Sequence, residues 1–461
     1  MTTASRRIAV FAPLALAALA GCAVRPAGEK KERERAEAMG RHYEESAKPE
    51  PLPDDPGPDD YLRHAFLANA DLESRYWDWR SAIERIPQDA SPPNAALPFS
   101  VMFNSGNMRL WDRTTLGVMN DPMTNIPFPS KLAAAGRRAL EDARAAGLRF
   151  EAAKFRLQAN VLSAYYDLAL IAESIRIREE TVSLTRQMAA QAEVMVGAGL
   201  APQNELLRAQ TEVELVDTDL ANLRSRVPPA AARLNALVGR PADAVVLLPA
   251  ALPERRELDV PDAELIRLGS ERSSELEALA RDVAGREEAL SLARQAYIPD
   301  FGLQASITGG IAQTLGGMIV LPTRLEAIRA GIEQARAQLR AAEAARTQYA
   351  RDLAASFVLN LAVLRDDERQ IALFDESIIP RARQTVDIAR TAYSASRASF
   401  ADLLDAERVL LDARLALAQF RIEREKSLAA IETWAAIDAG AMLSGRRGGR
   451  AIGGLTEPMM R

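Results

Sequence analysis

The sequence predicts a mainly helical chain with a small β part, built from two tandem repeats. An internal duplication comes first: residues 196–210 and 393–407 align without a gap, each reading as a helix end, a short turn and a new helix start. A proline-free run from Ser130 to Ala201 predicts a very long helix ahead of the first turn. Alternating apolar and polar segments precede each long helix and predict strands.

The duplication extends beyond the turns. Apolar residues recur every seven residues in both halves, a spacing that places them on one seam of a coiled helix pair. An Ala-, Leu-, Arg- and Glu-rich composition could imitate some of this similarity by chance. It would not also reproduce the order of helix, paired strands, long helix, turn and helix. The recurring residues are Val161, Leu168, Ile175 and Val182, and then Phe357, Leu364, Ile371 and Ile378.

In the first repeat, residues 61–85 read as a short helix. Turn residues follow, and an alternating run at 97–104 predicts a half-buried strand, with a weaker partner at 114–119. The long helix ends at Gly199, and Pro202 suits the start of a return helix, which Pro228 and Pro229 interrupt near residue 226.

In the second repeat, a helix over 263–296 leads into the clearest strand of the chain, 301–308. Gly309 and Gly310 predict a turn, and 315–321 the partner strand. A second long helix should run to Tyr393 with a break at Pro380. The final helix is expected from Phe400 to about Ala436.

The N-terminus carries targeting information. Basic residues at Arg6 and Arg7 precede an apolar run that is too short to span a bilayer, so residues 1–21 read as a signal peptide. The run ends in Leu-Ala-Gly-Cys22, which resembles the bacterial lipobox, where the cysteine is lipidated. The alternative is an ordinary cleaved signal peptide with an incidental cysteine. Ala23 in the next position favours the outer membrane by analogy with lipoprotein sorting.

These features divide the chain into five parts. A lipoprotein signal peptide is followed by a lipid anchor and disordered tether over 22–57, a charged and then proline-rich stretch. The first repeat covers 58–250 and the second 251–437. A glycine-rich tail, 438–461, is expected to be disordered.

The composition limits the possible functions. Cys22 is the only cysteine, so no internal disulfide can form, and His42 and His64 are the only histidines. A histidine-based metal site or a catalytic triad therefore has little to work with, and we expect no metal and no cofactor. The formal net charge of −5 argues against nucleic acid as a partner. No phosphate-binding glycine loop, H-E-x-x-H or G-x-S-x-G motif is present, so we expect no enzyme.

Four membrane-length strands cannot close a barrel alone, because open sheet edges do not occur in lipid. Three copies would supply twelve strands and twelve long helices. The sequence therefore predicts a trimeric 12-strand β-barrel on a 12-helix periplasmic tube.

Four motifs in this order resemble the TolC-type outer-membrane efflux family and its lipoprotein subgroup. They are A-Y-Y-D-L-A-L at 164–170, V-G-A-G-L-A at 196–201, A-R-Q-A-Y-I-P-D-F at 293–301, and the stretch 392–413. The resemblance spans about residues 60–436. It implies a homotrimeric exit duct that receives substrates from a periplasmic membrane-fusion adaptor and an inner-membrane pump, and that performs no chemistry.

The resemblance also implies two kinds of site. The adaptor-docking turns would be Gly199, Leu200 and Ala201, with Ser396, Arg397, Ala398 and Ser399. The channel gate would be formed by Glu205, Tyr393, Asp402 and Asp405. In a trimer each carboxylate becomes a ring that favours cations. Helix capping is the alternative for Glu205 and Asp402, which lie in first turns where the helix dipole favours a carboxylate.

Two departures from the family pattern remain. The usual glycine of the second turn is Ser396, and polar residues crowd the first strand pair between 97 and 120. A non-conducting periplasmic scaffold lipoprotein of the same fold is therefore a second hypothesis, and a lipid-anchored enzyme a third. The alternating strands over 301–321 favour the channel, since a scaffold has no use for them.

Overall fold

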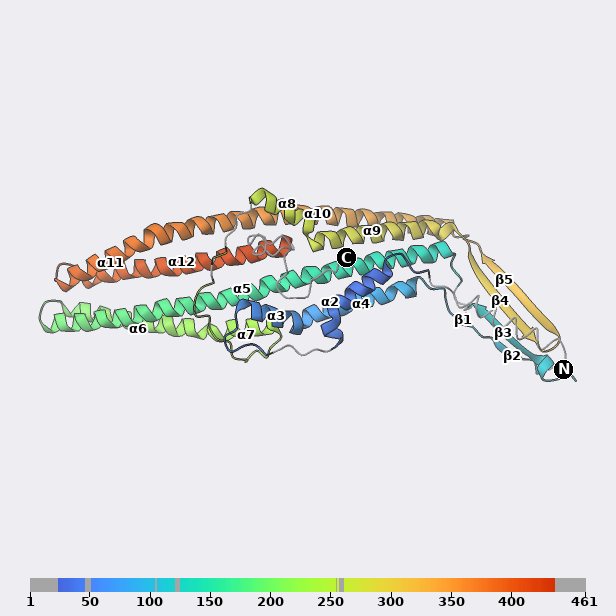
Figure 1. The fold of residues 1–461 in the computed structure, drawn as a ribbon, viewed down its shortest axis with the longest axis horizontal. Helices are drawn as coiled ribbons and strands as arrows, with labels where there is room; N and C mark the ends of the chain where they lie inside the picture. The colour runs from blue at the N-terminus through green and yellow to red at the C-terminus, as the bar shows by residue number, and fades with distance from the viewer. Residues whose placement is uncertain are drawn as a thin grey trace. The chain divides into compact units, whose positions relative to one another are not determined.

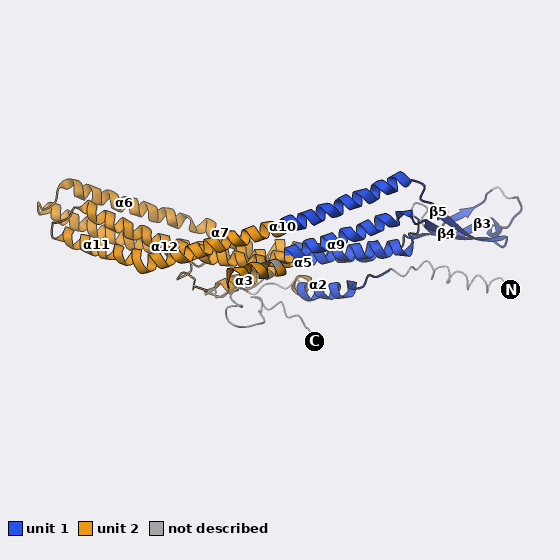
Figure 2. Ribbon diagram, turned by 90° about the horizontal axis from the view of Figure 1, so that it is seen from above, with its two compact units in different colours: residues 1–40, 75–150, 275–349 blue, residues 41–74, 151–274, 350–461 orange. Residues whose placement is uncertain are grey.

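The computed structural model describes residues 24–45, 51–103, 106–120, 125–253, 255–256 and 261–435. Cys22, the signal peptide and the predicted tail 438–461 lie outside these ranges. The chain forms two compact units (Figure 2). Unit 1 consists of residues 1–40, 75–150 and 275–349, and unit 2 of residues 41–74, 151–274 and 350–461.

The order of elements confirms a mainly helical fold with a small sheet (Figure 1). The helices are α2 (Glu29–Glu44), α3 (Pro58–Ala68), α4 (Ala70–Asp89), α5 (Pro129–Gly197), α6 (Gln203–Ser225), α7 (Val227–Val238), α8 (Asp262–Arg272), α9 (Ser274–Arg294), α10 (Leu325–Leu373), α11 (Ile379–Ser394) and α12 (Phe400–Ala435). The strands are β1 (Ala95–Ala96), β2 (Phe99–Val101), β3 (Thr114–Asn120), β4 (Asp300–Thr308) and β5 (Ala312–Val320). Short turns η1 (Trp111–Arg113), η2 (Gln295–Tyr297) and η3 (Phe374–Ile378) complete the list.

The sheet lies in unit 1 and is antiparallel throughout, with β3 between β1 and β4, and β5 next to β4. Within the described part of the strand predicted over 97–104, only β2 is a strand; β1 lies just before this range, and both pair with β3. Pro98 lies between β1 and β2, where it has no N–H to donate to the sheet. Its carbonyl still accepts a hydrogen bond from Gly117 N at 2.9 Å.

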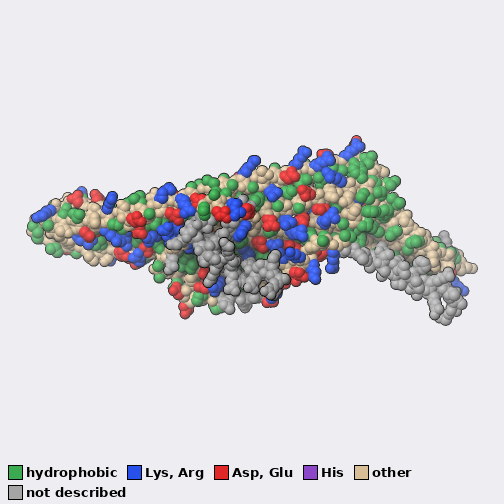
Figure 3. All heavy atoms as spheres, turned by 45° about the horizontal axis from the view of Figure 1, so that its top comes forward, with side chains coloured by type: hydrophobic (Ala, Val, Ile, Leu, Met, Phe, Trp, Pro, Cys, Tyr) green, Lys and Arg blue, Asp and Glu red, His purple; other side chains and the backbone are tan. Residues whose placement is uncertain are grey.

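The strand register places most large apolar side chains on one face, while the other face mixes Thr, Ser, Gln and Gly residues with Met119, Met318 and Asp300. Phe301 pairs with Ile319, Ala305 with Leu315, and Leu116 with Ile307, so these side chains share one face. On the opposite face, Thr115 and Thr308 approach to 2.9 Å between their hydroxyl oxygens. Leu315 and Ile319 are 84% and 62% exposed. Hydrophobic side chains gather in the part of unit 1 that carries the sheet, whereas charged side chains are spread over the helices (Figure 3).

The two repeats share a helix break that the sequence did not predict. The single helix expected over 61–85 is interrupted at Asn69, which has an extended backbone and caps α4 by accepting a hydrogen bond from Leu72 N at 2.9 Å. Ser273 separates α8 from α9 with nearly the same dihedral angles. Helix pairs α3–α4 and α8–α9 are therefore equivalent parts of the duplication.

Prolines shape the long helices as predicted, with one difference. Pro228 and Pro229 lie in the first turn of α7, directly after α6. At Pro380 the helix does not break; a π-helical turn, η3, joins α10 to α11 instead. A π turn shifts the hydrogen-bond register, so the missing N–H of the proline is tolerated without ending the helix.

The charged segment before residue 57 differs from the expected tether. Residues 29–44 form helix α2, and several of its side chains are buried, including Glu29, Glu32 and Ala36. The prediction of a disordered tether is wrong for this stretch, because apolar and aromatic partners on α4 cover the helix. Within the described part of the chain, no helix has both the length and the apolarity needed to cross a membrane.

Candidate functional site

The two predicted docking turns connect α5 to α6 and α11 to α12 in unit 2, and they adopt the same backbone conformation. Gly199 has φ +71° and Ser396, its counterpart in the repeat, has φ +56°. Leu200 N donates to Met195 O at 2.9 Å, and Arg397 N donates to Ala392 O at 2.8 Å. Each turn thus closes its helix with a six-residue loop of the Schellman type.

Ser396 carries the left-handed conformation without the freedom of glycine. It is the one non-glycine residue with positive φ among the residues described. Such a conformation costs a residue with a Cβ atom about 1–2 kcal/mol. The turn is nonetheless formed like its glycine counterpart, so the departure from the family pattern does not alter its shape.

We expect Ser396→Gly to raise the free energy of unfolding by about 0.5–1 kcal/mol, since the strain relieved exceeds the added chain entropy. Urea denaturation of the purified protein measures this change. Ser394→Gly, in the last helical position of α11, is the matched control and should lower stability by a similar amount. Destabilisation by both substitutions would contradict a strained turn.

A hydrophobic cluster supports both turns from beneath. It brings together Met188, Ala192 and Met195 of α5, Ala209 of α6, Tyr393 of α11, and Phe400 and Leu403 of α12. The rings of Tyr393 and Phe400 meet edge to face at 6.0 Å between centroids. This packing fastens the two helix pairs to each other close to their turns.

The four predicted gate residues have different surroundings in the single chain. Tyr393 is buried in the cluster, with 1% of its surface exposed. Burial, and secondarily the nearby Glu205 carboxylate, raises the pKa of the Tyr393 phenol. Glu205 is half-buried in the first turn of α6. Asp402 and Asp405 are exposed in the first turns of α12.

Asp402 caps its helix. Its Oδ2 accepts hydrogen bonds from Ser399 N at 3.0 Å and from Ser399 Oγ at 2.8 Å. Asp402 N in turn lies 3.3 Å from Ser399 Oγ, to which it donates. This reciprocal arrangement is a capping box, and the bonds from Ser399 lower the pKa of the Asp402 carboxyl group. Asp405, one turn further along α12, has no such role.

Ion pairs close to the turns join three of the helices on which the turns lie, α6, α11 and α12. Arg390 of α11 meets Glu407 of α12 at 2.9 Å. Arg408 of α12 meets Glu212 of α6 at 2.6 Å. A groove of about 470 Å³ lies among α5, α11 and α12 and is lined by residues of these three helices. The groove contains both acidic and basic side chains, including Glu180, Asp387, Arg383 and Arg414.

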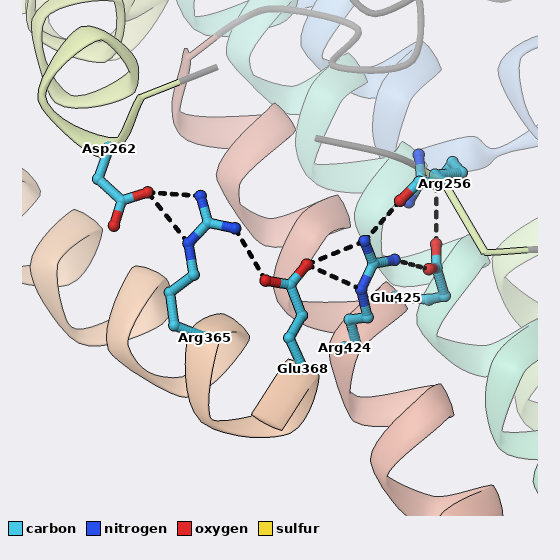
Figure 4. Close-up of polar contacts among 6 residues, drawn as sticks. All are labelled: Arg256, Asp262, Arg365, Glu368, Arg424 and Glu425. Carbon is cyan, nitrogen blue, oxygen red and sulfur yellow. Dashed lines mark hydrogen bonds and ion pairs between the residues drawn. The ribbon is translucent and has the colours of Figure 1, made fainter. Parts of the chain in front are cut away.

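A buried chain of charges lies deeper in unit 2 (Figure 4). Arg424 of α12 is 1% exposed and binds Glu368 of α10, Glu425 and the carbonyl oxygen of Arg256. The Arg256 guanidinium forms ion pairs with Glu425 at 2.8 Å and with Glu432 at 2.5 Å. Glu368 also forms an ion pair with Arg365 of α10, at 2.8 Å.

The charge chain holds both ends of the segment that joins the two repeats. Arg256 lies at one end of this segment, and Asp262, which accepts a bond from Arg365 at 2.7 Å, lies at the other. This feature was not predicted from the sequence. The signal that could have revealed it is the seven-residue row 411, 418, 425, 432 of α12, which passes from Leu and Ala to two glutamates, all buried.

No metal centre emerges from the described ranges: they hold no group of three or more His, Cys, Asp or Glu side chains arranged to bind a metal ion.

Comparison with known proteins gives the same picture. Residues 63–240 match the model of the outer membrane efflux protein family. A search of curated protein sequences found no match.

Three solved structures illustrate the likeness. The outer membrane protein VceC from Vibrio cholerae has 18% identity and a TM-score of 0.70, covering 82% of this chain and 96% of VceC. The outer-membrane channel OprN has 19% identity and a TM-score of 0.71, with 86% and 95% covered. The open-state outer membrane channel MtrE from Neisseria gonorrhoeae has 18% identity and a TM-score of 0.62, with 88% and 91% covered.

The chain therefore has the fold of TolC-type outer-membrane channels. Within it, residues 63–240 of the first repeat match the model of the outer membrane efflux protein family.

Proposed function

We propose that this chain is the outer-membrane exit duct of a tripartite efflux system. The observation that carries the proposal is the sheet, whose register gathers most large apolar side chains on one face, while the other face mixes Thr, Ser, Gln and Gly residues with Met119, Met318 and Asp300. An apolar face suits lipid, and the more polar face suits a water-filled passage. The duct conducts passively and performs no covalent chemistry.

A homotrimer follows from the two edges of the sheet. Strand β5 pairs only with β4, and β1 and β2 pair only with β3, within the residues described. Unpaired backbone groups cost several kcal/mol each in hydrocarbon, so both edges need a partner in the membrane. Three copies would join edge to edge as a closed barrel, with their long helices forming the periplasmic tube.

The two like turns of unit 2 are the proposed docking surface for a periplasmic membrane-fusion adaptor, which links the duct to an inner-membrane pump. Gly199, Leu200, Ser396 and Arg397 are exposed there, and Leu200 is 65% exposed although apolar. Ala201, Ala398 and Ser399 flank them and are partly buried. Lipidation of Cys22 would add a second attachment to the outer membrane.

We expect the purified protein to be a trimer in detergent and to conduct ions in planar bilayers. Analytical ultracentrifugation and single-channel recording measure the two properties. A stable monomer without conductance would favour the alternative, a non-conducting periplasmic scaffold of the same fold.

A pair of neighbouring substitutions tests the two faces of β4. Leu303→Arg, on the apolar face, should cost about 2–4 kcal/mol near the middle of the membrane and abolish conductance. Gln304→Arg, on the opposite face, should preserve assembly and change only the single-channel conductance. Equal loss of assembly in both variants would contradict the assignment of faces.

A further inference from the structure

We propose that Arg324 is a clamp between copies of this chain: its guanidinium binds the next copy at Asn94, where strand β1 begins. The chain already contains one such joint, between its own two repeats. The inference rests on the proposed homotrimer, and it adds the residues by which one copy recognises the next.

The internal joint lies where α5 begins, beside the start of β4. Lys131, in the first turn of α5, donates from Nζ to Asp300 Oδ1 and to the Ile298 carbonyl oxygen, both at 2.7 Å. Just before it in the chain, Ile126 and Phe301 exchange two backbone hydrogen bonds, of 2.7 and 2.9 Å. Only 12% of the Lys131 side chain is exposed. A charge pair and a short piece of backbone pairing therefore fasten the first repeat to the second.

The second repeat carries the same half of the joint. Residues 126–132 read I-P-F-P-S-K-L and residues 319–325 read I-V-L-P-T-R-L, so Arg324 stands where the first repeat has its lysine. Its side chain is exposed and, within the ranges that the structure describes, has no hydrogen-bond or ion-pair partner. Ile319 and Leu321 are 62% and 65% exposed. This half of the joint is thus formed without a receiving strand.

A receiving strand lies at the opposite edge of the sheet. Residues 299–303 read P-D-F-G-L and residues 93–97 read P-N-A-A-L, so Asn94 corresponds to Asp300. Asn94 is exposed, and among the described strands β1 pairs with β3 alone. Joining β5 of one copy to β1 of the next therefore repeats, between chains, the step from β3 to β4 within one chain.

The charges of the two surfaces are complementary. Residues 86–108 contain a single charged side chain, the carboxylate of Asp89, and no Lys or Arg. Arg324 lies between β5 and α10, and a cation without a partner beside lipid is unfavourable. A guanidinium has five N–H donors in a planar fork, so it can bind an amide oxygen and a carboxylate together. The second joint thus has an arginine for the lysine, and an amide with a nearby acid for the aspartate.

Cysteine crosslinking of the detergent-solubilised protein tests the clamp, since Cys22 is the only native cysteine. Asn94→Cys combined with Arg324→Cys is treated with a short bis-maleimide. A disulfide is unsuitable because it needs Cα atoms about 4–7 Å apart, closer than two long side chains that meet at their ends. We expect covalent dimers and trimers on a denaturing gel. Each single-cysteine variant should remain monomeric on that gel, which controls for reaction at Cys22.

Lys131→Cys combined with Asp300→Cys is the matched control, because it places the same two thiols at the internal joint. The reagent should link them within one chain, so the gel shows a monomer and peptide mass spectrometry shows the link. Suppose that ultracentrifugation shows a trimer and the internal pair is linked. Failure to link 94 to 324, or a link within one chain, would then overturn the clamp. A monomeric wild-type protein would instead overturn the proposed trimer.

A charge reversal gives a second readout. Arg324→Glu should raise the monomer fraction in detergent roughly tenfold or more, because like charges placed together across an interface cost several kcal/mol. Adding Asn94→Lys should restore the trimer, since it recreates opposite charges in reversed order. Rescue would not occur if the first substitution merely disturbed folding. A monomer fraction that Arg324→Glu leaves unchanged, or that Asn94→Lys fails to restore, would count against the clamp.

Discussion

Replacing Arg424 with alanine is expected to lower the free energy of unfolding by about 3–5 kcal/mol, because it removes the buried guanidinium that Glu368 and Glu425 share and leaves each carboxylate with one arginine fewer. Arg424 supplies bonds to Glu368, Glu425 and the Arg256 carbonyl from a side chain that is 2% exposed. The loss should appear as a shift in the urea midpoint of the detergent-solubilised protein.

An exposed ion pair of α10 is the control. Arg369 meets Asp366 at 2.6 Å, with 70% and 54% of their side chains exposed. Arg369→Ala should change stability by less than about 1 kcal/mol, since surface pairs are screened by solvent. If Arg424→Ala were equally mild, the buried charge chain would not contribute to the stability of the native state. Nearby Asp367 is another buried carboxyl group, and burial raises its pKa to about 6.

The second large effect concerns ion selectivity. Asp405→Ala should reduce the preference of the channel for cations severalfold, because in a trimer its carboxylates would form a ring near the periplasmic entrance. Reversal potentials across a bilayer with a salt gradient measure the preference. Unchanged reversal potentials would show that Asp405 lies outside the conduction path.

Asp402→Ala separates gating from capping. Its carboxylate is held by Ser399 in a capping box, so its loss should cost roughly 1 kcal/mol of stability and alter selectivity less than the loss of Asp405. A larger effect of Asp402 on the reversal potential would mean that the capping bonds open in the conducting channel.

Local patterns in the sequence were sufficient to predict most elements. The alternation over 301–308 predicted β4 and its two faces, and glycine and proline around 199–202 predicted the first turn. These predictions succeed because strand periodicity, helix periodicity and turn chemistry depend on neighbours close in the chain. The duplication predicted the second turn as well. There Ser396 adopts the same left-handed backbone conformation as Gly199, its counterpart in the first turn.

Tertiary contacts decided the rest. From the sequence alone, residues 29–44 are predicted to be a solvated tether. In the structure they pack against Trp79 and Tyr76, which lie far along the chain. Tyr393 read as a gate residue, yet its ring is buried among apolar partners from α5, α6 and α12. The partners of Arg424 come from three segments, and burial makes each charge depend on the others. Sequence spacing alone therefore determined helices, strands and turns, whereas the folded chain determined which charged and aromatic side chains are buried, because burial depends on residues distant in sequence.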